Sequence, residues 1–263
     1  MRYSRALQKK IKNYYTVYYR DLCGLPDWEV RVEKRIHEED KEVKRIERVQ
    51  SLLNKKFTAT QKHFIFGAGT GGLAITLSRE YGCDVYGIEP DEEEFEIIQD
   101  KCTVAGINSD NFKKEYGEEL SFGNDQFDVV NCFTVIEHVE DEEKCIQEMI
   151  RITKPGGHIY INTPNYNYPY EGHYKIPFPT FLPKPLGYFY LILIGRPWKF
   201  LKTINFVTEK SINKILNRQK NIEWMRVYRP LERKTNIMSF FFNFIKHTLF
   251  IYPDQEIIIK KIS

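Results

Sequence analysis

The sequence predicts an α/β protein in which helices cover both faces of a mainly parallel sheet. Three observations predict this fold class. Short apolar segments alternate with helical segments between residues 63 and 163, a glycine-rich turn joins the first apolar segment to its helix, and a Pro-Gly-Gly sequence closes the last helix of the series. Because parallel strands need crossover connections, this alternation places helices on both sides of the sheet. The 263 residues suffice for one such domain with additions.

The first 60 residues predict a helical extension ahead of the sheet. Apolar residues recur among many charged ones, mostly three, four or seven positions apart: Val30, Ile36, Val43, Ile46, Val49 and Leu53. This spacing places them on one face of a helix. We therefore divide the chain into an N-terminal helical extension, residues 1–60, and a sheet domain, residues 61–263.

Strands and helices alternate along the first half of the sheet domain. We expect strands at 63–67, 84–89, 127–133 and 158–163, a weak strand near Phe112, and helices at 70–80, 92–105 and 141–153. The sequence Lys-Pro-Gly-Gly at 154–157 ends the last of these helices, because proline and glycine do not continue one.

The alternation breaks after Thr163. Residues 164–207 form an insertion rich in Pro, Tyr and Phe, which is long and irregular enough to predict a functional cap. Thr208 then looks like an N-cap residue. The chain continues with a helix at 209–219, a strand at 221–228, an aromatic helix at about 234–250 and a last strand at 256–262.

Composition and charge exclude several function classes. Lys and Arg number 39 against 36 Asp and Glu, so no nucleic-acid partner is expected. The five cysteines are scattered without a CxxC pair, which indicates reduced thiols and neither a disulfide nor a structural metal. The N-terminus lacks the apolar run of a secretory signal, and no segment reaches the roughly 20 apolar residues of a membrane-spanning helix. We expect a cytoplasmic protein, with peripheral membrane attachment as an open alternative.

The glycine turn FGAGTGG, residues 66–72, is the first candidate for ligand binding. Its glycines let the backbone turn sharply, and the helix that follows presents free amides to a polar ligand. Glu89 ends the second strand about 20 residues later, where a carboxylate can accept hydrogen bonds from ribose hydroxyls. Gly67, Gly69 and Gly72 also satisfy the GxGxxG pattern of NAD-dependent dehydrogenases, so the turn alone leaves that enzyme class open.

Further motifs favour another family. FDVVNCF is followed at once by VIEHVED, and the next helix ends in KPGGHIYINTPN. Over residues 60–165 this run resembles the class I S-adenosylmethionine-dependent methyltransferases, most closely the branch with the quinone and glycan methyltransferases. The resemblance implies S-adenosylmethionine as the cofactor and a Rossmann-like sheet of seven strands in the order 3-2-1-4-5-7-6, with the last strand antiparallel.

The same resemblance implies roles for particular residues. Gly67, Ala68, Gly69 and Gly71 would lie under the methionine part of the cofactor, Glu89 would hold its ribose, Pro90, Gly117 and Glu118 would border the adenine, and Cys132 and Phe133 would border the sulfonium. Two positions depart from the family pattern, because Ile65 and Tyr116 stand where acidic residues usually contact the cofactor. These departures keep open a noncatalytic partner protein with a vestigial cofactor fold.

Methyl transfer to a hydroxyl needs a base, and a histidine suits this role near neutral pH. His138, after the fourth strand, and His173, in the insertion, are equal candidates. Quinone O-methyltransferases, by the resemblance, have a glutamate that helps to hold a divalent cation where this chain has Thr134. With Glu137 alone we expect no metal site, and we interpret Glu137 as a residue that orders its loop.

The aromatic segments bear on the acceptor. Residues 177–206 and 237–252 are apolar and aromatic, and Lys184, Arg196, Lys199 and Lys202 accompany the first of them. The tyrosine-rich N-terminus could lie beside both segments. Such a surface either docks on an anionic membrane or roofs the substrate pocket. The sequence therefore predicts an O-methyltransferase that acts on a small or lipid-linked acceptor of the glycan or quinone kind.

Overall fold

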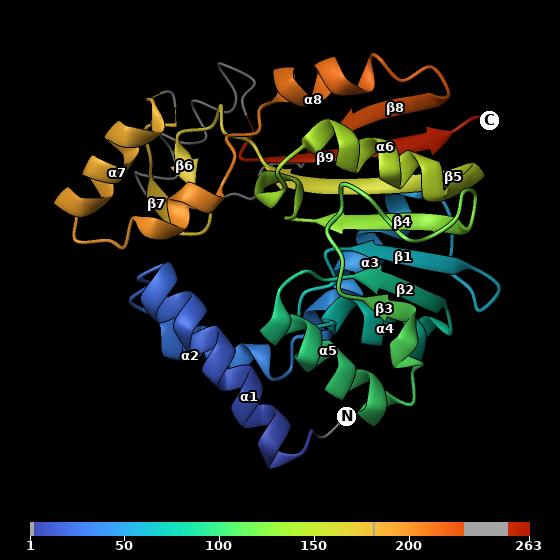
Figure 1. Cartoon of the computed structure of the whole chain (residues 1–263), viewed down its shortest axis with the longest axis horizontal. Coiled ribbons are helices and arrows are strands. Elements are labelled where there is room, and N and C mark those ends of the chain that lie inside the picture. The colour runs from blue at the N-terminus through green and yellow to red at the C-terminus, as the bar shows by residue number, and fades with distance from the viewer. Residues whose placement is uncertain (1–2, 181, 229–251) are drawn as a thin grey trace.

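A seven-stranded sheet forms the centre of the molecule (Figure 1). The structure, a computed structural model, describes residues 3–180, 182–228 and 252–263. The strands of the sheet are β1 (Lys62–Phe66), β2 (Asp84–Ile88), β3 (Phe112–Lys113), β4 (Phe127–Phe133), β5 (Thr153–Pro164), β8 (Ile222–Val227) and β9 (Asp254–Lys261). Their order is β3-β2-β1-β4-β5-β9-β8, and β9 runs antiparallel to both of its neighbours. This is the predicted order 3-2-1-4-5-7-6 once the short insertion strands are left out of the count, so the predicted fold is confirmed.

Helices cover both faces of the sheet. The helices of the described residues are α1 (Arg5–Thr16), the π-helical η1 (Val17–Leu22), α2 (Trp28–Arg35), α3 (Glu39–Leu53), α4 (Gly72–Tyr81), α5 (Glu92–Ala105), α6 (Glu142–Ile152), α7 (Lys184–Leu193) and α8 (Glu209–Leu216), with 3-10 turns η2 (Ser109–Asn111), η3 (Ile136–His138) and η4 (Lys199–Thr203). α6 and α8 pack on the face that carries Phe64 and Phe66, whereas α3, α4 and α5 pack on the face that carries Ile65. Successive strand residues alternate between faces, which is why neighbours on β1 belong to different cores.

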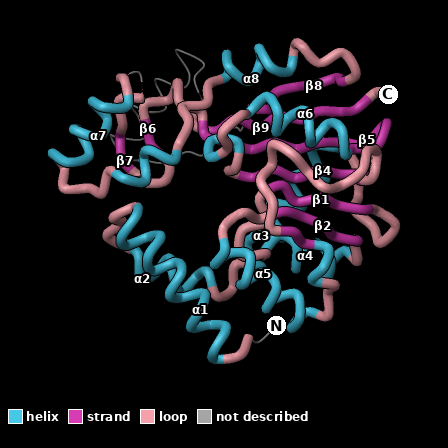
Figure 2. Tube along the Cα trace, viewed as in Figure 1, coloured by secondary structure: helices cyan, strands magenta, loops and turns pink. Residues whose placement is uncertain are grey.

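The N-terminal helices lie against the sheet domain through a stripe of apolar residues. Leu7, Ile11, Tyr15 and Tyr19 recur every fourth position and are buried. They pack with Ile97 of α5, and α1 lies along that helix (Figure 2). A surface helix is held in this way by its apolar face rather than by its own propensity.

The insertion after β5 has a small core of its own. Two short strands, β6 (Tyr170–Glu171) and β7 (Ile176–Pro177), pair in an antiparallel ribbon beside α7 and η4. Tyr166, Tyr174, Phe178, Leu191, Leu201 and Ile204 are buried together there. In the part of the chain that the structure describes, no helix is both long and apolar enough to cross a membrane.

Several local predictions need correction. Val30, assigned to a buried stripe, is 56% exposed, and its neighbour Val32 is buried instead. The helix does end before residues 154–157, as predicted, but the strand that follows begins at Thr153 and not at 158, and its register with β4 is irregular there. The apolar middle of the insertion forms the helix α7 instead of irregular chain. The aromatic helix predicted at 234–250 lies outside the described residues.

Candidate cofactor and acceptor site

A cavity of about 560 Å³ lies at the carboxyl ends of β1, β2 and β4. Its size is within the range of small-molecule sites, and this edge of an open α/β sheet is where such proteins bind ligands. Its walls come from the glycine turn, from the loops after β2 and β4, from the N-terminal helices and from Phe200 of η4.

The glycine turn after β1 forms one wall of the cavity. Gly67, Gly69 and Gly71 all have positive φ values, of +73°, +54° and +86°. A Cβ at Gly71 would lie 2.6 Å from Ile98 Cγ1, so the turn is packed tightly on its inner side. At Gly69 the only atom within 4 Å of such a Cβ is Glu94 Oε1 at 3.7 Å, among the described residues. Gly69 therefore leaves room for a ligand close to the backbone, at the start of α4.

Glu89 follows β2 and is held by the glycine turn. Its Oε2 accepts a hydrogen bond from the Gly69 amide at 2.7 Å, and its Oε1 accepts one from the Asp91 amide at 3.0 Å. Burial raises the pKa of the carboxyl to about 7, although both amides oppose the shift. Each carboxylate oxygen can accept a second hydrogen bond, so Glu89 can still bind the two hydroxyls of a ribose. Burial and the Glu89 charge also raise the pKa of Glu94, on the same wall, to about 8.

Most of the residues that the resemblance singles out line this cavity: Gly67, Ala68, Gly69, Gly71, Glu89, Pro90, Gly117, Glu118 and Phe133. Cys132 does not, because its side chain is fully buried in the core on the opposite face of β4 from Phe133. Glu118 Oε1 also accepts hydrogen bonds from the amides of Glu140 and Asp141, so it orders the loop that leads to α6.

The N-terminal helices contribute residues to the cavity that the sequence did not reveal. They are Tyr14, Tyr15, Tyr18, Leu22, Arg35, Glu38, Glu42 and Arg45. Among these residues, the repeated tyrosines were the feature that the sequence offered for predicting a contact with the aromatic insertion. The structure has this contact, since the ring centroids of Tyr18 and Phe200 are 5.6 Å apart. The tyrosines are buried or half-buried, however, so they do not offer a free surface to a membrane.

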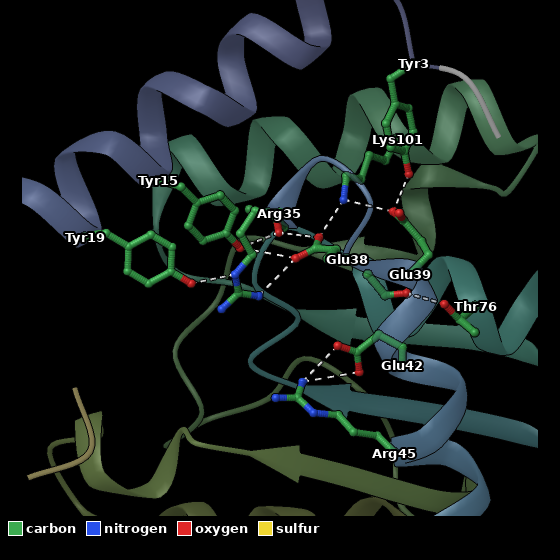
Figure 3. A network of polar contacts seen from close by, with 12 residues as sticks. Tyr3, Tyr15, Tyr19, Arg35, Glu38, Glu39, Glu42, Arg45, Thr76 and Lys101 are labelled. Atoms are coloured by element: carbon green, nitrogen blue, oxygen red, sulfur yellow. Dashed lines mark hydrogen bonds and ion pairs between the residues drawn. The ribbon is translucent and has the colours of Figure 1, made fainter. Parts of the chain in front are cut away.

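Glu38 connects the extension to the glycine turn (Figure 3). Its Oε1 accepts hydrogen bonds from Lys101 Nζ at 2.5 Å and from Thr70 Oγ1 at 2.6 Å, and its Oε2 accepts one from Arg35 Nη1 at 3.1 Å. Burial alone would raise the pKa of this carboxyl, but Lys101 and Arg35 lower it to about 2. An ionised and fully bonded Glu38 therefore fixes Thr70, a residue of the turn itself.

The two candidate bases lie together, His138 in η3 and His173 in the insertion. The ring centroids of His138 and His173 are 5.2 Å apart, and His138 lines the cavity whereas His173 does not. His173 Nδ1 lies 2.7 Å from Glu171 Oε1, and this carboxylate raises the pKa of His173 against the opposing effect of burial. The surrounding protein and the nearby His173 lower the pKa of His138 to about 4. His138 is therefore neutral at physiological pH.

Glu137 points into the interior beside these histidines. Its Oε2 accepts a hydrogen bond from Thr163 Oγ1 at 2.9 Å, and burial raises its pKa to about 7. Glu137, His138 and His173 each offer one ligand atom, and these atoms lie within 4.8 Å of one another. The hydrogen bond to Thr163 joins the turn after β4 to the end of β5, which is a loop-ordering contact.

Comparison with known proteins agrees with this geometry. Residues 65–161 match the family model described as Methyltransferase domain. The ubiquinone biosynthesis O-methyltransferase of Pectobacterium atrosepticum is 29% identical over 121 residues, which cover 46% of this chain and 47% of that relative. The match thus spans less than half of the relative's own length.

Two solved structures have the same fold over nearly their whole length. One is a putative S-adenosyl-L-methionine-dependent methyltransferase from Methanococcus maripaludis, with a TM-score of 0.56, 14% identity and coverage of 100% of this chain and 97% of that one. The other is geranyl diphosphate C-methyltransferase from Streptomyces coelicolor A3(2), in complex with Mg2+, geranyl diphosphate and S-adenosyl-L-homocysteine, with a TM-score of 0.57, 13% identity and coverage of 99% and 100%. At such identities the likeness shows the fold alone.

Proposed function

We propose that this chain, whose residues 65–161 form a methyltransferase domain of the class I fold, transfers a methyl group from S-adenosylmethionine to a hydroxyl of a small aromatic acceptor. One observation carries the proposal. A single cavity is lined both by the glycine turn with Glu89 and by His138 with the rings of Tyr18 and Phe200. Cofactor and acceptor would thus meet in one enclosed space, which is what a direct transfer requires.

The part of the cavity around His138 favours a quinone-like phenol over a sugar. Val139, Tyr18 and Phe200 line it, and the centre of the Phe200 ring lies 5.6 Å from that of Tyr18 and 5.9 Å from that of His138. These side chains pack on a flat apolar ring, whereas a sugar needs many hydrogen-bonding groups. The similarity to a ubiquinone biosynthesis O-methyltransferase supports the same acceptor class.

His138 is the base that we assign to the reaction. When bound, S-adenosylmethionine would supply an electrophilic methyl group to the acceptor oxygen. His138 Nδ1 lies 3.4 Å from the Thr203 carbonyl, so we place the proton of the neutral ring on Nδ1 and leave Nε2 to accept the acceptor proton. His173, bonded to Glu171, is a positioning residue behind His138.

Cofactor binding is the first test. Calorimetric titration with S-adenosylhomocysteine should show micromolar affinity for the wild type and its loss in Glu89→Ala. NAD serves as the comparison ligand. Binding of NAD instead would favour a dehydrogenase, and binding of neither ligand would favour a noncatalytic partner protein; either result contradicts the proposal.

The role of His138 is tested with labelled S-adenosylmethionine and a panel of catechol and sugar acceptors. His138→Ala should lower kcat by roughly 100-fold or more with little change in KM, since the loss concerns proton transfer. His173→Ala should have a smaller effect and change the pH profile of kcat. If both variants keep the wild-type rate, neither histidine is a base.

No metal belongs to the proposed chemistry, because Thr134 replaces a ligand position of the quinone enzymes and His138 serves as a base. We expect EDTA to leave the methylation rate unchanged. A rate that EDTA abolishes and Mg2+ restores would contradict this expectation and would assign the cluster of Glu137, His138 and His173 to a cation.

A second proposal, that the protein docks on anionic lipid to reach a lipid-linked acceptor, is supported by α7. Leu186, Phe189, Ile192 and Leu193 of this helix are 50–67% exposed. Residues 172–208 contain no Asp or Glu, but they include Lys184, Arg196, Lys199 and Lys202. Exposed apolar side chains beside uncompensated cations suit the surface of an anionic bilayer.

Sedimentation with phosphatidylserine vesicles at low salt tests this docking. The wild type should pellet with the vesicles, and the double variant Phe189→Ser/Leu193→Ser should stay in the supernatant. Val104→Ser is the matched control, because Val104 is 46% exposed on α5, far from the cationic segment in the chain. A wild type that remains in the supernatant is not a membrane binder.

A further inference from the structure

β1 lacks the acidic residue that, by the resemblance, usually contacts the cofactor from two positions before the first glycine. Ile65 occupies that position, lines the cavity and is only 3% exposed, in the core that β1 shares with α3 and α4. S-adenosylmethionine ends in an α-amino acid with an ammonium and a carboxylate on one carbon. A buried site for such a group needs charges of both signs, because an unpaired charge removed from water is strongly destabilised.

α3 carries both charges into the cavity. Glu42 and Arg45 are one turn apart on this helix, and both line the cavity with the glycine turn. Both Glu42 oxygens lie within hydrogen-bonding distance of Arg45 Nη1, at 2.9 and 3.2 Å. The Arg45 guanidinium lies 5.4 Å from the centre of the Phe133 ring, at the end of β4. The pair therefore lies beside the strand end where the methyl group would be transferred.

Glu42 differs from Glu38 in its remaining capacity for hydrogen bonds. Lys101, Thr70 and Arg35 donate to Glu38, whereas within the described residues Arg45 alone donates to Glu42. Glu42 is 4% exposed, so water cannot supply many of the missing donors. Burial raises the pKa of Glu42 in spite of Arg45, which indicates that the carboxylate is not fully compensated. An incoming ammonium would provide the donors that it lacks.

Resting on the proposed function, we propose that Glu42 and Arg45 form the subsite for the amino-acid end of S-adenosylmethionine. Glu42 accepts hydrogen bonds from the ammonium, and Arg45 donates to the carboxylate. The zwitterion thus lies against an ion pair of opposite polarity, and the N-terminal extension supplies the charge that the first strand lacks at Ile65. The extension is then part of the cofactor site, not an appendage to it.

Calorimetric titrations with three ligands distinguish the role of Glu42, which binds the ammonium, from that of Arg45, which binds the carboxylate. S-adenosylmethionine has both charges, decarboxylated S-adenosylmethionine keeps only the ammonium, and 5′-methylthioadenosine has neither. Glu42→Gln should lower the affinity for S-adenosylmethionine and for its decarboxylated form by roughly tenfold or more, which is the effect of losing a hydrogen bond to a charged group. Arg45→Met should lower only the affinity for S-adenosylmethionine, because the other two ligands have no carboxylate. Neither substitution should change the affinity for 5′-methylthioadenosine more than about twofold, within the spread of indirect effects.

Glu47→Gln is the matched control, since Glu47 is exposed on the same helix. It should bind all three ligands as the wild type does. Two results would overturn the subsite: wild-type affinity for S-adenosylmethionine in both Glu42→Gln and Arg45→Met, or an equal loss for 5′-methylthioadenosine, which would point to a general disturbance of the fold. Either leaves the proposed function intact if the wild type binds S-adenosylmethionine. A wild type that binds no ligand overturns both proposals.

Discussion

At the scale of single residues, the ribose contact that we propose for Glu89 predicts that cofactor binding is sensitive to pH. Its carboxyl must be ionised to accept two ribose hydroxyls, yet burial raises its pKa to about 7. We expect the affinity for S-adenosylhomocysteine to fall as the pH drops below 7, approaching tenfold per pH unit, because each binding event must then release one proton. Calorimetry at pH 6, 7 and 8 measures this. Equal affinity at all three values would show that Glu89 is ionised throughout or does not contact the ligand.

Substitutions of single residues in the ion pair of Glu38 and Lys101 test how much this pair stabilises the folded protein. Lys101 is fully buried and Glu38 is 4% exposed, and they are joined at 2.5 Å. We expect Glu38→Gln or Lys101→Met alone to lower the free energy of unfolding by about 1–3 kcal/mol, because each removes one partner of a buried ion pair while Glu39 still pairs with Lys101 and Arg35 still pairs with Glu38. The double variant should lose less than the sum, and urea unfolding measures all three. Additive losses would show that the two side chains do not interact.

The lowered pKa of Glu38 also predicts how its contribution to stability changes with pH. The folded carboxyl has a pKa of about 2, against 4.5 in the unfolded chain. Its stabilising contribution is therefore fully present above pH 4.5 and is lost as the pH falls from 4.5 to 2. Unfolding at pH 7 thus reports the full effect of the Glu38 substitution.

At the scale of secondary-structure elements, the turn into α4 depends on steric room at Gly71. We expect Gly71→Ala to destabilise the protein by about 1–3 kcal/mol more than Gly106→Ala. Both glycines have a positive φ, of +86° and +70°, but only an added Cβ at Gly71 meets Ile98 Cγ1, at 2.6 Å. Thermal unfolding compares the two variants. Equal losses would assign the whole effect to the left-handed backbone conformation.

The sequence predicts those elements that are determined by residues adjacent in the chain, and it does not predict those that depend on contacts between distant residues. The strand of FDVVNCF and the glycine turn follow from residues adjacent in the chain, and the family motifs add the order of the sheet. The placement of the N-terminal helices could not be predicted, because Tyr15 reaches Thr70 and Tyr18 reaches Phe200 across large sequence separations. Hydrophobic spacing identifies the buried face of a helix but not the partner that it packs against.

In the candidate site, too, some residues could be predicted from sequence motifs and others only from the packing of the folded chain. The motif residues could be placed at the cavity from the sequence, since they follow β1, β2 and β3 or end β4. Cys132 was misplaced because the motif identifies a strand end without saying which of two adjacent side chains faces the ligand. Glu42 and Arg45 carry no such motif, and charged residues on a helix usually face solvent, so their position at the cavity emerges only from the packing of α3.

At the scale of the whole molecule, the pH dependence of stability is set by buried groups that titrate in opposite senses. Burial raises the pKa of Glu94 to about 8 and that of Glu137 to about 7, and it lowers the pKa of His63 to about 4. The two glutamates hold protons in the folded state that the unfolded chain releases above pH 4.5, so they stabilise the protein as the pH falls from 8. His63 stays unprotonated in the folded state at pH values below 6.5 at which the unfolded chain binds a proton, so it destabilises the protein as the pH falls further.

Because the gain from two glutamates exceeds the loss from one histidine until the pH nears 4.5, and the contribution of Glu38 is lost below that pH, the ligand-free protein should have its highest Tm at about pH 5. Saturating S-adenosylhomocysteine should move this maximum upward, since the ligand binds the form with ionised Glu89 and stabilises the folded state by mass action. Differential scanning fluorimetry from pH 4 to pH 9, with and without the ligand, measures both curves. A ligand-free maximum above pH 8 would mean that Glu94 and Glu137 are ionised in the folded protein, and a maximum unmoved by the ligand would mean that no proton is exchanged at Glu89.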